Sequence, residues 1–148
     1  PPPSAPLQAA LLSGHGIKSE VAVAAEKFGY HFGLAFQIID DLLDFTASSD
    51  DLGKPGLQDM ALGLSTAPVL YAAEEYPELK ELIARKFGAQ GDVLRACELV
   101  LEGDGLPRTK QLATFHAQAA VDACCSMPPS EARDGLIRLC HIVLSRSS

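Results

Sequence analysis

Three aspartates lie within an otherwise apolar segment of the chain, Phe36–Phe45, whose sequence is FQIIDDLLDF. Burying a carboxylate costs free energy unless a cation or hydrogen bonds compensate its charge. If the segment is helical, Asp40 and Asp44 lie one turn apart on one face, with about 5–6 Å between their Cβ atoms, and Asp41 lies beside them. Mg²⁺ prefers oxygen ligands and is usually bound by one or two carboxylates together with substrate phosphates. The spacing therefore predicts a Mg²⁺ site at Asp40, Asp41 and Asp44, and with it a phosphorylated substrate.

Lys54 follows the aspartates by ten residues, in the sequence DLGKP, and supplies a flexible positive charge of the kind that binds phosphate. The alternative interpretation is a solvated acidic helix end followed by an ordinary loop lysine. Electrostatics disfavour this alternative, because aspartates at i and i+4 repel by about 0.2–0.5 kcal/mol. Negative charge near a helix C-terminus costs about 0.3–1 kcal/mol more. We therefore expect a bound cation.

The motif FQIIDDLLDF followed by LGKP resembles the second aspartate-rich motif of the trans-polyprenyl diphosphate synthases, with its trailing Gly-Lys-Pro. Downstream, the sequence DMALGLSTAPVLYA is similar to that family's D-x3-G-x2-T-x-P helix start, with Asp59, Gly63, Thr66 and Pro68 at the motif positions. The sequence SEARDGLIRL is similar to the family's closing helix. The resemblance thus covers nearly the whole chain, and it is strongest to the catalytic-type subunit of mitochondrial solanesyl or decaprenyl synthases, which make the ubiquinone tail.

The resemblance implies an all-α fold, the C-terminal part of an isoprenoid-synthase-type helical bundle. It also implies a reaction in which an allylic diphosphate ionises and isopentenyl diphosphate attacks the allylic cation. Mg²⁺ held by Asp40, Asp41 and Asp44 would neutralise charge on the departing diphosphate. Lys54 would bind the same diphosphate. Gln37, one turn before Asp40, would contribute to diphosphate binding by orienting a metal-bound water, or would shape the cation pocket.

The chain departs from the family pattern in two respects. It lacks the earlier DDxxD motif, the associated basic residues and the Lys-Thr pair, since its other Asp-Asp pair, Asp50-Asp51, is followed by Gly53-Lys54. Leu64 also stands where many bacterial homologues have a lysine. The resemblance is therefore to the C-terminal half alone, which we expect to be inactive without the N-terminal helices and their isopentenyl diphosphate site.

Two further functions remain open from the sequence. One is a noncatalytic interaction subunit, or a truncated product, that binds a partner synthase; the missing motifs favour it. The other is a class I terpene cyclase, whose second metal motif is not evident after Asp44.

A helix with Phe28, Phe32 and Phe36 on one face needs apolar neighbours to cover that face. We therefore expect a homo-oligomer, or a hetero-oligomer with a second synthase subunit.

Composition limits the remaining possibilities. The 148 residues are 47% hydrophobic and carry a net charge of −7, which makes nucleic acid and anionic membrane surfaces improbable partners. No apolar run reaches the length of a membrane span, and the start shows no signal or transit pattern.

A mitochondrial location is implied by the resemblance only. Residues 1–14 are interpreted as a Pro-rich stub or truncated helix, and residues 15–148 as the C-terminal half of the synthase domain.

Apolar periodicity predicts helices throughout. The first strong helix runs from about Ser19, a candidate N-cap, to Phe45. Its predicted core stripe consists of Phe28, Phe32, Ala35, Phe36, Ile39 and Leu43. Gly29 and Gly33 on another face predict close approach of a neighbouring helix or a ligand. A loop over about residues 46–58 carries Lys54, and Ser65 or Thr66 caps the next helix. Further helices are predicted over about 77–87, 91–102, 106–126 and 130–145.

The cysteines and histidines show no metal-ligand spacing. The four cysteines, Cys97, Cys124, Cys125 and Cys140, form no C-x2-C pair and are interpreted as reduced core thiols. His15, His31, His116 and His141 fall in different predicted elements and are interpreted as structural or surface residues.

Overall fold

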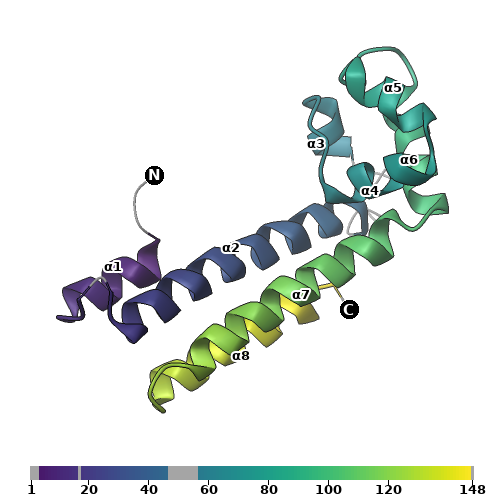
Figure 1. The fold of residues 1–148 in the computed structure, drawn as a ribbon. Coiled ribbons are helices and arrows are strands. Elements are labelled where there is room, and N and C mark those ends of the chain that lie inside the picture. Colours follow the sequence, from purple (N-terminus) through teal and green to yellow (C-terminus); the bar gives the residue numbers. More distant parts are fainter. Residues whose placement is uncertain (1–3, 17, 47–56, 148) are drawn as a thin grey trace. The chain divides into compact units, whose positions relative to one another are not determined.

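The computed structural model describes residues 4–16, 18–46 and 57–147, and over these ranges the chain is helical without a strand (Figure 1). The all-α prediction is thereby confirmed. The described helices are α1 (Ala5–Leu12), α2 (Glu20–Thr46), α3 (Leu57–Ala61), α4 (Ala67–Glu75), α5 (Glu78–Ala84), α6 (Asp92–Glu102), α7 (Gly105–Cys125) and α8 (Glu131–Ser145).

Helix starts and ends follow local capping chemistry. Ser19 acts as the predicted cap of α2, because its Oγ accepts the Ala22 amide at 3.2 Å. Ser130 caps α8 in the same way and accepts the Arg133 amide at 3.0 Å. Thr66 occupies the N-cap position of α4, although its side chain makes no cap hydrogen bond.

Two helix predictions are wrong in detail. Helix α5 ends at Ala84 rather than near Phe87, because Lys86 and Phe87 adopt left-handed φ angles of 53° and 55°. Helix α3 has five residues, of which the first two fall in the predicted loop and the other three were assigned to no helix. Residues 47–56, with Lys54 among them, lie outside the described ranges.

The chain divides into two compact units, which we call the first and second units. The first consists of residues 1–37 and 112–148, and the second of residues 38–111. Helices α2 and α7 each contribute to both units, so the acidic end of α2 belongs to the second unit.

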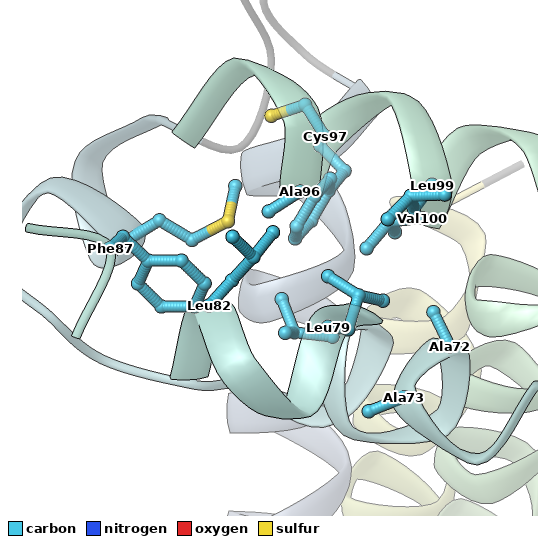
Figure 2. Packing of buried hydrophobic residues seen from close by; sticks show 12 residues of the cluster. Ala72, Ala73, Leu79, Leu82, Phe87, Ala96, Cys97, Leu99 and Val100 are labelled. Atoms are coloured by element: carbon cyan, nitrogen blue, oxygen red, sulfur yellow. The ribbon is translucent and has the colours of Figure 1, made fainter. Parts of the chain in front are cut away.

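The second unit is built around one apolar cluster. Figure 2 shows Leu79 and Leu82 of α5 pointing toward α6, which contributes Ala96, Leu99 and Val100. Met60 of α3 and Phe45 of α2 join the same cluster, and both are almost completely buried. Full burial of an aliphatic or aromatic side chain is worth about 1.5–3 kcal/mol. The cluster thus attaches the short helix α3 to the rest of the unit.

The first unit packs Phe28 of α2 against Ala120 and Cys124 of α7 and Cys140 of α8. Figure 1 shows α7 and α8 side by side. Helix α1 approaches α2 at Gly29, where an added Cβ would lie 2.9 Å from Ser4 Oγ. The predicted close approach at Gly29 is therefore to a neighbouring helix.

At Gly33 an added Cβ would meet no described atom within 4 Å, so no described helix approaches this position, and the ligand alternative stays a prediction. The predicted core stripe of α2 needs correction at two positions. Phe36 is 43% exposed and lies under the Arg146 guanidinium, whose Cζ is 5.1 Å from the ring centroid. Leu42, rather than Leu43, continues the buried face and is 4% exposed.

Three of the four cysteines, Cys97, Cys124 and Cys140, are buried free thiols, as predicted, whereas Cys125 is exposed. Burial raises the pKa of the Cys124 thiol to about 11, with smaller contributions from the two neighbouring cysteines. These buried thiols are therefore protonated at neutral pH. Within the described part of the chain, none of the helices has the length and apolarity needed to cross a bilayer.

Candidate metal centre

The three predicted metal ligands lie in the last turns of α2. Asp40, Asp41 and Asp44 are all half-buried there, and Gln37, one turn earlier, is exposed and belongs to the first unit. The last turn of α2 carries no basic residue. Because carbonyl dipoles point their negative ends toward a helix C-terminus, Asp44, which lies in this turn, is in an unfavourable local field. The roles predicted for Lys54 cannot be placed, since it lies outside the described residues.

Asp44 has the most unusual environment of the three. Its Oδ2 is buried, and no described residue donates a hydrogen bond to it. Its carboxylate accepts a hydrogen bond from the backbone amide of Asp59, in α3. Burial raises the pKa of the Asp44 carboxyl above its ordinary value, the charge of Asp59 raises it further, and the Asp59 amide partly opposes both. The site therefore holds a carboxylate whose charge is only partly compensated.

Asp59 is the member of this site to which sequence reasoning gave no role. It is half-buried and close enough to Asp44 for the two charges to interact. Cys97 of α6 lies near the same carboxylate, because the charge of Asp44 adds to burial in raising the pKa of the Cys97 thiol to about 11. The available sequence signal was the spacing D-x3-G-x2-T-x-P, which begins at Asp59.

That motif builds the turn that holds Asp59 in place. Gly63 has a φ of +76°, and an added Cβ would lie 3.1 Å from the Lys86 Cβ. The Leu64 amide donates to the Asp59 carbonyl at 2.9 Å, which closes the end of α3. Pro68 then stands in the first turn of α4, where a missing amide proton costs little. The motif residues thus shape the turn after α3, and Asp59, the first of them, also places its charge beside Asp44.

The described residues do not gather three or more His, Cys, Asp or Glu side chains into a ready-made metal cage. The assignment of Asp40, Asp41 and Asp44 to one ion therefore stays a prediction. Mg²⁺ does not require such a cage, because it keeps several waters and takes one or two carboxylates plus phosphate oxygens. A buried carboxylate oxygen without a donor, beside a second carboxylate, fits a divalent cation of this kind.

Comparison with known proteins decides the family. The Polyprenyl synthetase family model matches residues 4–100. The chain belongs to the polyprenyl synthetase family. It is 47% identical to the decaprenyl-diphosphate synthase of Dictyostelium discoideum over 94% of this chain. It is 46% identical to the human all trans-polyprenyl-diphosphate synthase PDSS1 over 82% of this chain. It spans 30% and 29% of these two curated relatives.

Solved polyprenyl synthetase structures show the same fold. The apo form of an Arabidopsis medium/long-chain length prenyl pyrophosphate synthase superimposes with a TM-score of 0.83 at 39% identity. It matches 97% of this chain and 49% of that one. A polyprenyl synthase from Caulobacter crescentus, complexed with calcium and isoprenyl diphosphate, has a TM-score of 0.76 at 31% identity. That match covers 96% of this chain and 44% of the Caulobacter chain. The family predicted from the aspartate motif is confirmed.

Proposed function

We propose that this chain supplies the metal- and diphosphate-binding C-terminal part of a long-chain trans-polyprenyl diphosphate synthase. The reaction would add isopentenyl diphosphate to an allylic diphosphate and form a new trans double bond. The observation that carries the proposal is the buried Asp44 Oδ2, which lacks a donor and lies beside Asp59. A relative solved with calcium and isoprenyl diphosphate supports a divalent cation and a diphosphate as ligands.

In this proposal Asp40, Asp41 and Asp44 hold Mg²⁺, directly or through water. When bound, the metal supplies positive charge that stabilises the departing diphosphate. Asp44 is oriented for this role by the Asp59 amide, which donates to its carboxylate and leaves Oδ2 available. Lys54 adds a point charge to the same diphosphate, and the exposed Gln37 side chain contributes an amide to diphosphate binding.

Further properties follow from the relatives. Three relatives are named as mitochondrial: the proteins named probable hexaprenyl pyrophosphate synthase in Neurospora crassa and in Yarrowia lipolytica, and a rice solanesyl-diphosphate synthase. We therefore propose a mitochondrial location and a part in making a ubiquinone side chain. The chain would act in an oligomer, with a copy of itself or with a second synthase subunit. Sites for isopentenyl diphosphate would lie on the N-terminal helices of the bundle.

The proposal is tested by calorimetric titration of the chain with a nonhydrolysable allylic diphosphate, with and without Mg²⁺. Binding should require Mg²⁺ and should be lost in the double variant Asp40→Asn, Asp44→Asn. Asp122→Asn is the matched control, because Asp122 is an exposed acid on α7 that pairs with Gln118. Equal binding by both variants would contradict the metal-site assignment. Mg²⁺-independent binding would contradict the metal site. No binding at millimolar ligand would mean that the N-terminal half is required or that the chain is a noncatalytic interaction subunit.

A further inference from the structure

Two histidines that are 85 residues apart in the sequence meet in the first unit. The Nδ1 atoms of His31, on α2, and His116, on α7, lie 2.9 Å apart, and both side chains are half-buried. Their ring centroids are 5.2 Å apart with an interplanar angle of 32°. Sequence reasoning treated the two residues as unrelated, because nothing local in the sequence links one helix to the other.

The pair is flanked by aromatic rings. Tyr30 meets the His31 ring edge-on with centroids 5.1 Å apart, and Phe115 meets the His116 ring similarly at 5.2 Å. Tyr30 and Phe115 are 61% and 63% exposed, so the rim of the cluster is open to water. These contacts restrain the two imidazole planes.

The two facing nitrogens have the chemistry of metal ligands. A proton on one of the two Nδ1 atoms makes a hydrogen bond to the other, whereas protons on both atoms would make the two rings repel each other. Burial lowers the pKa of the His116 imidazole, and the neighbouring His31 lowers it further, which favours the neutral, ligating form. Zn–N bonds of 2.0–2.1 Å at a tetrahedral angle place two ligand nitrogens about 3.3–3.4 Å apart. The observed separation is therefore a few tenths of an ångström shorter than this, and both rings would turn on metal binding so that the two Nδ1 lone pairs point at the ion.

We propose that His31 and His116 form a two-imidazole site for a divalent transition metal of the Zn²⁺ type, with water completing the coordination. The described residues provide no third His, Cys, Asp or Glu ligand, so the metal should bind reversibly rather than as a closed structural site. Imidazole ligands select Zn²⁺, Cu²⁺ and Ni²⁺ over Mg²⁺, which keeps this site chemically distinct from the aspartate centre. Bound metal would link α2 to α7 within the first unit.

The test uses Zn²⁺ alone as the probe, in excess Mg²⁺ and on a Cys125→Ser background, because Cys125 is the exposed thiol. Calorimetry should give one Zn²⁺ per chain, with a rise in the thermal unfolding temperature that a chelator reverses. His31→Gln and His116→Gln should each weaken Zn²⁺ binding by at least tenfold. His141→Gln is the control, because His141 is a single exposed histidine on α8 and should leave binding unchanged.

A second readout separates ligation from folding. Nitrogen NMR of the imidazoles should show the Nδ1 resonances of both His31 and His116 shifting together as Zn²⁺ is added. Circular dichroism establishes that each variant remains helical. The proposal is overturned if Zn²⁺ shifts neither imidazole, or if affinity in the two variants equals that of the His141→Gln control. The pair would then be a hydrogen-bonded contact between α2 and α7.

Discussion

Two carboxylates of the second unit, Asp92 and Asp44, have opposite environments. Asp92 is 4% exposed and fully satisfied: Arg85 donates to both of its oxygens at 2.7 Å, and the Ala89 amide donates at 3.0 Å. The hydrogen bonds from Arg85 lower the pKa of the Asp92 carboxyl, the Ala89 amide lowers it too, and burial opposes them. Asp44 instead has a buried oxygen without a donor, and its pKa is raised.

The difference separates a structural acid from one available for chemistry. Arg85 and the Ala89 amide stabilise the charged form of Asp92, so this residue fixes the start of α6 and needs nothing further. At Asp44, burial and the Asp59 charge both oppose ionisation. A carboxylate held under these conditions gains most from an added cation.

Asp92→Asn should cause the largest loss of stability. The substitution removes the charge from the doubly hydrogen-bonded Arg85 pair and places an amide where two donors already point. We expect the melting temperature to fall by several degrees, measured by circular dichroism. Glu78→Gln is the control, because it weakens an exposed ion pair to Arg95, and such pairs contribute little. Equal effects of the two variants would refute the structural role of Asp92.

Gly63→Ala should destabilise the turn beneath Asp59 by about 1–2 kcal/mol, since an L-residue is strained at a left-handed φ. Gly91→Ala is the matched control: its φ is +88°, but an added Cβ meets nothing within 4 Å. At Gly63 the new methyl also contacts Lys86 and displaces α3. Chemical denaturation should therefore show a greater loss for Gly63→Ala, and only this variant should weaken diphosphate binding.

Asp44→Asn should leave the free energy of unfolding unchanged or raise it by about 0.2–0.5 kcal/mol, the size of one like-charge repulsion. The amide removes the repulsion from Asp59 and keeps an oxygen that accepts the Asp59 amide. Urea denaturation of this variant beside the unsubstituted chain measures the difference. A loss of stability as large as that of Asp92→Asn would show that the two acids do not differ.

The free energy of unfolding should depend on pH in the range where Asp92 titrates. Its folded pKa lies below the ordinary value of 3.8, so its stabilisation is present above that value and is lost as pH falls through the folded pKa. In Asp92→Asn, the free energy of unfolding should therefore fall less steeply as the pH is lowered. Denaturation between about pH 5 and pH 2 measures this, and an unchanged slope would contradict the assignment.

Sequence reasoning located the acidic helix, the family and most helix bounds, because the apolar period of α2, α6, α7 and α8 is long and regular. It missed α3, which has too few residues for periodicity to be read. It placed Phe36 in the core, although a ring on the apolar face can instead lie under an arginine such as Arg146. The role of Asp59 and the meeting of His31 with His116 depend on tertiary packing, which local spacing does not encode.

The central claim is that Asp44, unlike Asp92, is available to bind a divalent cation. Mn²⁺ titrated into the chain with inorganic pyrophosphate reports this directly, because it stands in for Mg²⁺ and broadens nearby amide signals in NMR spectra. We expect broadening that is strongest at Asp44 and Asp59 and weaker at Asp92, that excess Mg²⁺ reverses and that Asp44→Asn abolishes. Broadening centred elsewhere, or unchanged in Asp44→Asn, would contradict the claim.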